Sequence, residues 1–300
     1  MEKKDHNRAY LLFTTAMVIY GSIGIFRRFI PLSSAALAFA RGLIGGVFLL
    51  LWVILTGKSL KLGISKKKLG LLFVTGIALG ANWILLFEAY NYTTVAVATL
   101  CYYMQPTLLI LLSPLVFREK LTTKKGLCAA VSLMGMALVS GVLGGDALGS
   151  GDIRGILFGL AAAAMYTTVI ILNKKNPVEN AYGKTVVQLF SSAAVLLPYL
   201  LLTEPPGSAS MNATAVVMLL VVCIVHTGMA YAMYFAGVQQ LPSQTVAVLS
   251  YIDPVLAMVL AAVILKEPMS ASELIGGVMI LGAAAVSEGI FHKKTSKPTA

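Results

Sequence analysis

The chain has 300 residues, of which 58% are hydrophobic and 12% are charged, and its net charge is +11. Soluble domains average about 45–50% apolar and about 25% charged residues, so this composition excludes a soluble enzyme and a disordered protein. Because a membrane-crossing helix needs about 20 apolar residues, the length accommodates about ten such helices with short connections and leaves no room for a separate water-soluble domain.

The sequence predicts an all-α membrane protein, because long apolar runs are separated by charged residues, glycine or proline. In chain order the expected spans are 9–27, 34–56, 69–89, 93–117, 126–144, 154–172, 182–203, 213–236, 243–265 and 273–291. The first run follows basic residues, as a signal peptide does, but Arg27 and Arg28 come directly after it. It is also long enough to span, so we expect it to remain as the first helix.

The basic residues predict the orientation. With the N-terminus inside, most of the 23 lysines and arginines fall on the cytoplasmic side, and only Arg27, Arg28, Arg154 and Lys266 fall outside. This positive-inside bias predicts a multi-pass protein of the cell (plasma or inner) membrane with both termini cytoplasmic. The same loops account for the net charge without nucleic acid. The three cysteines lack metal-ligand spacing, so we expect neither a metal site nor a cofactor.

The two halves of the chain resemble each other. When the chain is compared with itself, Tyr103 aligns with Tyr251 and Pro106 with Pro254. The alignment predicts two repeats, residues 1–146 and 147–300, with five spans each. An odd number of spans inverts the second copy relative to the first, which is a recurrent plan of secondary transporters. Glycine pairs with small-xxx-small spacing, such as those at 42/46, 76/80 and 155/159, predict close helix contacts.

Motifs at matched positions in the two copies resemble a known family. Residues 251–254 (Tyr-Ile-Asp-Pro) and 265–270 (Leu-Lys-Glu-Pro-Met-Ser), with 105–106 (Gln-Pro) and 117–122 (Phe-Arg-Glu-Lys-Leu-Thr) in the first copy, are similar to the EamA repeat of the drug/metabolite transporter superfamily. The resemblance implies ten helices around a central cavity, both termini inside, and transport of a small metabolite. We expect Glu119 and Glu267 within these motifs to fix their turns through caps and basic neighbours.

Asp253 is the sharpest candidate for chemistry, because a charged side chain inside the hydrocarbon costs about 2.5–3.5 kcal/mol on insertion scales. It directly precedes Pro254, which lacks an N–H and should leave the carbonyl of Ser250 unpaired one turn earlier. Such a site could hold a cation, a substrate ammonium or a transferred proton. The alternative is a carboxyl that caps the broken helix or pairs with Arg41. Pro106 is expected to break the fourth span in the same way.

Other polar and aromatic residues in the spans are expected to line the cavity. The complete set of cavity candidates is Tyr20, Asn82, Trp83, Tyr102, Gln105, His226, Tyr231, Ser250 and Asp253. The rings could form a box for a cation or an amino-acid side chain, although packing between helices is the alternative for each ring. For His226 the alternatives are a proton relay with Asp253 and a hydrogen-bonded packing role.

Arg41 and Glu88 are candidates for carboxylate binding or ion coupling. Arg41 could bind a substrate carboxylate bidentately, but its long side chain could also snorkel or pair with Glu88, and the structural interpretation is favoured. Glu88 ends the third span and could be solvated or part of an outer gate. Asp253 is the first choice as proton carrier and Glu88 the second.

The leading hypothesis is a monomeric secondary transporter that exports a small metabolite, an amino acid or a related amphipathic compound, by alternating access. The export direction rests on analogy with the family. The first alternative is a transporter of organic cations or drugs. A membrane-embedded enzyme or a scaffold is disfavoured, because the sequence lacks catalytic clusters and carries an acid in mid-span.

Overall fold

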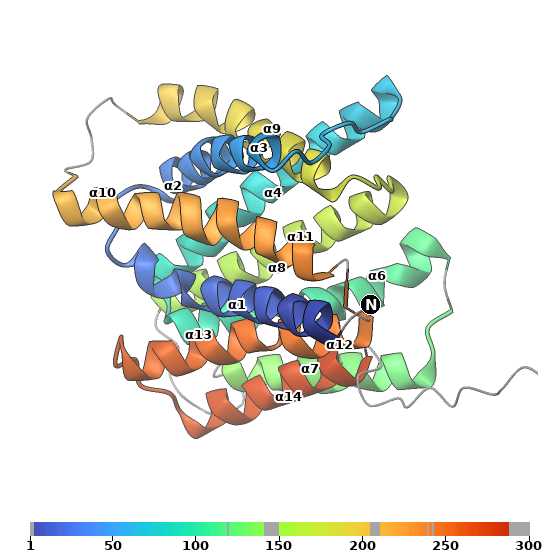
Figure 1. The fold of residues 1–300 in the computed structure, drawn as a ribbon. Coiled ribbons are helices and arrows are strands. Elements are labelled where there is room, and N and C mark those ends of the chain that lie inside the picture. Colours follow the sequence, from blue (N-terminus) through green and yellow to red (C-terminus); the bar gives the residue numbers. More distant parts are fainter. Residues whose placement is uncertain are drawn as a thin grey trace, which may run out of the picture.

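The computed structural model describes residues 3–118, 120–140, 150–204, 211–238, 240–241 and 243–287. Over these residues the chain is helical and contains no strand, and its helices lie roughly along one direction as a bundle (Figure 1). The predicted all-α architecture is therefore confirmed for the described part of the chain.

Each expected span is helical over most of its described length. In the first half the elements are α1 (Lys3–Arg27), α2 (Ser34–Ala40), η1 (Arg41–Gly45), α3 (Gly46–Leu55), α4 (Lys66–Tyr92), α5 (Val95–Tyr102), α6 (Gln105–Phe117) and α7 (Thr123–Val139). In the second half they are α8 (Ser150–Lys175), α9 (Ala181–Thr203), α10 (Ala213–Leu220), η2 (Val221–Met229), α11 (Ala230–Val238), α12 (Ser243–Ser250), α13 (Ile252–Val263) and α14 (Ala271–Ser287).

Seven helical stretches in the described residues, some of which join consecutive elements such as α2, η1 and α3, are long and apolar enough to cross a membrane, and α13 and α14 are shorter apolar helices. The count of ten crossings and the inverted repeat remain predictions. Several helices begin at the polar residue that the sequence places there: the side chains of Ser65, Thr94, Thr122, Asn180 and Asn212 each accept a hydrogen bond from a backbone N–H of the first turn.

Both predicted helix breaks are present, but they lie before the prolines rather than at them. The first separates α5 from α6 at Tyr103 and Met104, and the second separates α12 from α13 at Tyr251. Pro106 and Pro254 occupy the first turn of the following helix, where a missing N–H costs nothing. Ser250 therefore ends α12, while Asp253 lies in the first turn of α13, so the two residues belong to different helices.

Two spans contain π-helical segments, η1 and η2, which pack against each other. A β-carbon added to Gly45 of η1 would lie 2.6 Å from Thr227 Cγ2 and 2.9 Å from the Cys223 carbonyl, both in η2. Because a π-helical turn holds an extra residue, each segment changes the phase of its helix. This phase change determines which side chains after each π-helical segment face the inside of the bundle.

The glycines with small-xxx-small spacing do lie at close helix contacts. A β-carbon added to Gly76 of α4 would lie 2.5 Å from the Gln188 carbonyl of α9, and one on Gly159 of α8 would lie 2.7 Å from the Cys101 β-carbon of α5. Helices α7 and α14 lie side by side at one edge of the bundle (Figure 1), where Gly135 and Gly276 face each other's backbone. This prediction is confirmed.

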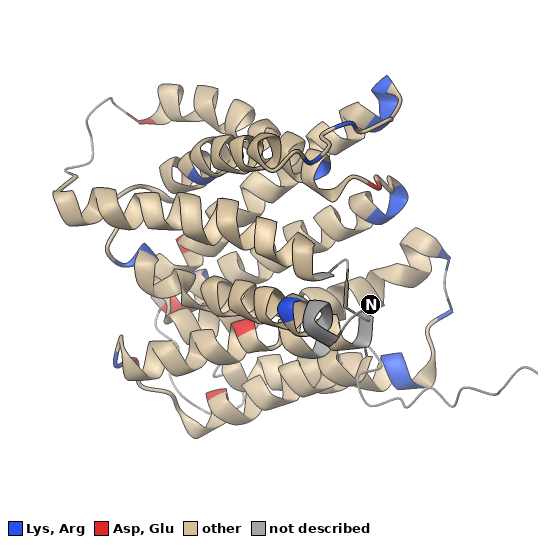
Figure 2. Cartoon of the chain, in the orientation of Figure 1, with Lys and Arg blue, Asp and Glu red and all other residues tan. Residues whose placement is uncertain are grey.

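Charge is unevenly distributed along the bundle. Figure 2 shows that most lysines and arginines gather at the end where α1 begins, which we call the basic end. The opposite end carries Arg27 and Arg28, where α1 ends, and the carboxylates Glu88 and Glu267 lie close to them. The remaining length of the bundle carries few charges, as expected for the part that lies within a bilayer.

Candidate functional site

A cavity of about 550 Å³ lies in the middle of the bundle and is enclosed by elements from both halves of the chain. Both helix breaks reach it, through Tyr103 and Gln105 in the first half and through Tyr251 and Asp253 in the second. Seven of the nine predicted cavity residues line it, as do Arg41 and Pro106; the seven are Tyr20, Trp83, Tyr102, Gln105, Tyr231, Ser250 and Asp253. Their participation in binding remains a prediction.

Asp253 lies in the first turn of α13 and is bound across the two halves of the chain. Its Oδ2 accepts a hydrogen bond of 2.8 Å from the hydroxyl of Tyr103, at the break between α5 and α6. It does not pair with Arg41, because the one ion pair among the described residues joins Arg28 to Glu267. The alternative in which Asp253 neutralises Arg41 is therefore wrong.

Arg41 opens η1 and lines the cavity while being only 5% exposed. Its Nε donates to Thr227 Oγ1 at 3.0 Å, and its guanidinium carbon lies 4.1 Å from the centre of the Trp83 ring. Stacking on an aromatic face lowers the cost of burying a guanidinium without removing its charge. Arg41 neither pairs with Glu88 nor snorkels to the surface, so these two forms of the structural interpretation are wrong, while its binding of a substrate carboxylate remains a prediction.

His226 does not line the cavity. Its Nε2 lies 3.0 Å from Ser22 Oγ, its ring packs edge-on against Phe26 at 4.7 Å, and its Nδ1 lies 3.4 Å from the Val221 carbonyl five residues earlier. That carbonyl belongs to η2, whose phase change turns His226 toward α1. The predicted cavity role of His226 is therefore corrected, and the hydrogen-bonded packing role describes its contacts.

Asn82 and Glu88 are also outside the cavity lining. The Asn82 amide donates to the Ala162 carbonyl of α8 at 2.7 Å, and Asn82 is buried between α4 and α8. Glu88 accepts from Ser34 Oγ at 2.6 Å and from Asn91 Nδ2 at 3.2 Å. Both side chains hold helices together, and neither contributes to the cavity surface.

Aromatic rings form much of the cavity wall. Tyr20 packs edge-on against Tyr231 with ring centres 5.9 Å apart, and Tyr102 packs against Tyr166 at 5.7 Å. The hydroxyl of Tyr20 and the side-chain oxygen of Gln105 are buried without a hydrogen-bond partner among the described residues. A buried polar atom without a partner costs about 1–3 kcal/mol, so both atoms are suited to a ligand that supplies the missing bond.

Several polar lining residues were not singled out from the sequence. Tyr103 holds Asp253, Gln188 Nε2 donates to Asn173 Oδ1 at 2.9 Å, and Lys184 lines the cavity toward the basic end. The alignment of Tyr103 with Tyr251 was visible in the repeat and could have identified Tyr103. Lys184 was counted only as a loop charge, although it lies in the first turns of α9.

A second hollow, of about 610 Å³, lies at the end opposite the basic end. Arg27, Arg28, Glu88 and Asn91 contribute to its wall, and Arg27 Nη2 donates to Asn91 Oδ1 at 3.2 Å. Tyr90 lines both this hollow and the central cavity, and its side chain is only 4% exposed. Tyr90 therefore forms part of the wall that separates the two spaces.

Chemically, the central cavity combines a carboxylate, a guanidinium and a set of ring faces in an interior that most of the molecule shields from water. Opposite charges at separate positions suit a ligand that carries both an ammonium and a carboxylate group. Ring faces suit the apolar or cationic remainder of such a ligand.

Comparison with known proteins identifies the family. The EamA-like transporter family model matches residues 7–141 and 153–288. The uncharacterized transporter YxxF of Bacillus subtilis (strain 168) is 27% identical over 96% of this chain and 91% of its own length. Protein PecM of Dickeya dadantii (strain 3937) is 27% identical over 76% of this chain and 77% of its own length.

A solved crystal structure has the same fold, with a TM-score of 0.64 at 21% identity over 93% of this chain and 96% of that one. The apolar helices and the family match make this a multi-pass membrane protein. The chain belongs to the EamA-like transporter family.

Proposed function

We propose that the protein is a secondary active transporter that exports a small zwitterionic metabolite, an amino acid or a related amphipathic compound, by alternating access. The family match supports transport as the class of function. The export direction rests on analogy with family members rather than on any feature of the cavity.

The observation that carries the substrate class is the presence of Arg41 and Asp253 on the surface of one cavity. Neither forms an ion pair within the part of the chain that the structure describes. Leaving two opposite charges in a low-dielectric interior is costly unless a partner compensates them. A substrate supplies both partners when its ammonium lies against Asp253 and its carboxylate against Arg41.

The transport cycle that we propose uses two inverted repeats of five spans each, ten in all, acting as a monomer. In this arrangement both termini are cytoplasmic and the basic end faces the inside of the plasma or inner membrane, in agreement with the positive-inside rule. The broken helices α5/α6 and α12/α13 meet at the cavity, as half-helices do at the substrate sites of other secondary transporters.

We assign Asp253 as the proton carrier for proton-coupled transport. Its carboxylate is bound only by the Tyr103 hydroxyl among the described residues and borders the cavity, so a proton and a substrate ammonium would compete for it. Glu88, the second candidate from the sequence, is held by Ser34 and Asn91 at the second hollow, which makes it the weaker candidate.

Thermal stabilisation of the purified protein across a panel of metabolites tests the proposal. A ligand at a hundredfold excess over its dissociation constant stabilises the folded state by about 2.7 kcal/mol. We expect zwitterionic amino acids to raise the melting temperature. Stabilisation only by compounds without a carboxylate would contradict the proposed class, and a scaffold would respond to no metabolite.

A second candidate, transport of organic cations or drugs, is favoured by the aromatic rings that line the same cavity as Asp253. The two candidates differ in their need for Arg41. An amine without a carboxylate that binds equally well to the wild type and to Arg41→Gln would favour the second candidate.

A further inference from the structure

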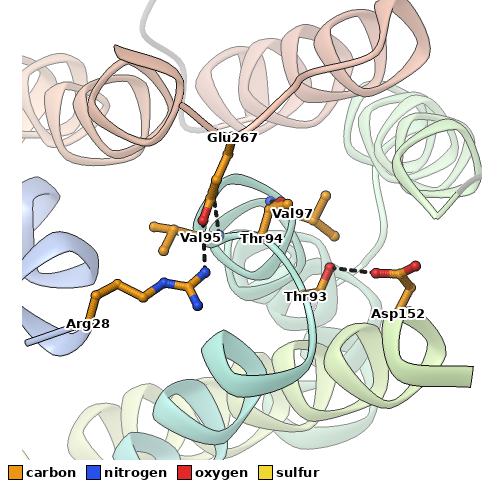
Figure 3. A network of polar contacts seen from close by, with 7 residues as sticks. All are labelled: Arg28, Thr93, Thr94, Val95, Val97, Asp152 and Glu267. Carbon is orange, nitrogen blue, oxygen red and sulfur yellow. Dashed lines mark hydrogen bonds and ion pairs between the residues drawn. The ribbon is translucent and has the colours of Figure 1, made fainter. Parts of the chain in front are cut away.

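A polar network fastens three elements together at the end of the bundle opposite the basic end (Figure 3). Glu267 follows α13, and its Oε1 accepts from Arg28 Nη2 at 2.8 Å at the end of α1. Its other oxygen, Oε2, accepts from the backbone N–H of Val95 at 2.8 Å, at the start of α5. One carboxylate from the second half thus binds two helices of the first half.

The three fastened elements are also walls of the central cavity. Helix α1 contributes Tyr20 and Gly24, α5 contributes Thr99 and Tyr102, and α13 contributes Asp253. The network lies at the end of these walls, beyond the part that encloses the cavity.

Helix α1 approaches both partners closely just below the network. A β-carbon on Gly21 would lie 2.5 Å from the Asp253 carbonyl oxygen and 3.1 Å from the Leu256 β-carbon, and one on Gly24 would collide with the Val95 side chain. No side chain larger than hydrogen fits at these two positions in this state. The walls of the cavity therefore meet directly beneath the carboxylate of Glu267.

We propose that Glu267 is the outer gate latch of this transporter: its carboxylate, bound to Arg28 and to the Val95 N–H, holds α1, α5 and α13 together so that the cavity is closed to the outside. The proposal rests on the proposed alternating-access function. Opening toward the outside must separate these walls, and it then breaks the ion pair and the bond to the α5 N-terminus.

The contacts of Glu267 differ from those of an ordinary turn-fixing carboxylate. Glu273, in the first turn of α14, accepts from the Ser270 N–H at 2.8 Å while its own N–H donates to Ser270 Oγ, which is a local capping box. Glu267 was expected to fix its own turn, but both of its oxygens bind elements far away in sequence. Glu273 is therefore a matched control for the loss of a nearby carboxylate that makes only local contacts.

The ion pair between Arg28 and Glu267 is weak enough to break during a transport cycle. The side chain of Arg28 is 40% exposed and that of Glu267 is 11% exposed. An ion pair that is partly exposed shifts an equilibrium by up to about fivefold, which favours the closed state of a gate but still allows it to open. The bond from the Val95 N–H adds to this, since a carboxylate at a helix N-terminus is favourable.

The test measures how readily the cavity is reached from outside. A reporter cysteine replaces Ala257, which lines the cavity on α13, in a background with Cys101, Cys128 and Cys223 changed to alanine. A charged, membrane-impermeant thiol reagent is applied to each face of sealed vesicles in turn. We expect Glu267→Gln to react up to about fivefold faster at the face opposite the basic end, and Glu267→Ala to react faster still because it also loses the Val95 bond.

Arg28→Gln should equal Glu267→Gln, and the double variant should be no faster than either single one, because both remove the same ion pair. Glu273→Gln should leave the rate at its starting value. Equal rates for Glu267→Gln and Glu273→Gln, or additive effects of Arg28→Gln and Glu267→Gln, would overturn the latch.

The labelling rate can be measured without a substrate. The proposed transport function and the proposed latch can therefore be refuted independently of each other. Faster labelling in Glu267→Gln, combined with no flux of any metabolite, would refute transport and retain the latch. Flux with unchanged labelling would refute the latch and retain transport.

Discussion

The substitution Asp253→Asn removes the negative charge of this side chain while keeping its size and shape. An asparagine is nearly isosteric, and its carbonyl oxygen can still accept the 2.8 Å hydrogen bond from Tyr103, so the break between α12 and α13 should keep its geometry. What the variant loses is the negative charge that we assign to the substrate ammonium.

The expected magnitude follows from that single contact. A hydrogen bond to a charged group is worth about 1.5–3 kcal/mol, which corresponds to an increase of about 10- to 100-fold in the dissociation constant. Calorimetric titration of the purified protein with the amino acid that stabilises it best measures this constant directly.

A matched control is Glu204→Gln, which removes a carboxylate that binds the Ser33 hydroxyl outside the cavity lining. We expect its dissociation constant to equal that of the wild type. If Asp253→Asn also binds the amino acid with wild-type affinity, the assignment of Asp253 to the ammonium is refuted.

Further expected outcomes concern the other residues of the site and the helix contacts. Arg41→Gln should weaken binding of an amino acid about tenfold or more while leaving its decarboxylated amine unaffected, as measured by competition, because only the carboxylate contact is lost. Tyr103→Phe should weaken amino-acid binding less than Asp253→Asn does, since it removes one hydrogen bond to the carboxylate and leaves the charge. Gly76→Ala should lower the melting temperature through a cost of about 1–3 kcal/mol, because its β-carbon would lie 2.5 Å from the Gln188 carbonyl. Gly70→Ala, on the same helix with open space around it, should stabilise by about 1 kcal/mol or less.

The sequence predicted the positions of the helices well, because segments that lie in lipid must be hydrophobic and the connections between them are charged. It predicted that both helix breaks lie near Pro106 and Pro254. It missed the exact place of each break, since proline is tolerated in the first turn of a helix and so marks the start of α6 and of α13 rather than the gap before them.

Which side chains face the cavity was harder to predict, for a physical reason. The inclusion of His226 among the cavity residues rested on its position within a span and took no account of which way its helix turns. The π-helical segment η2 changes the phase of its helix, and within it His226 lies against Ser22 rather than the cavity. No hydropathy pattern reveals such a shift.

Contacts between distant segments were likewise outside the reach of the sequence. The bonds from Tyr103 to Asp253 and from Arg28 to Glu267 each join the two halves of the chain. Each of these residues was visible as a polar or charged group, but its partner became evident only from the packing of α1, α5 and α13. Glu119, the repeat partner of Glu267, lies outside the described residues.

The central claim is that opposite charges in one cavity between the two halves carry a zwitterion across the membrane. Counterflow of a labelled amino acid into proteoliposomes preloaded with the same unlabelled compound tests it most directly. We predict saturable uptake in the wild type, with and without a pH gradient, and none in the double variant Arg41→Gln/Asp253→Asn. Equal uptake by the double variant and the wild type would contradict the account.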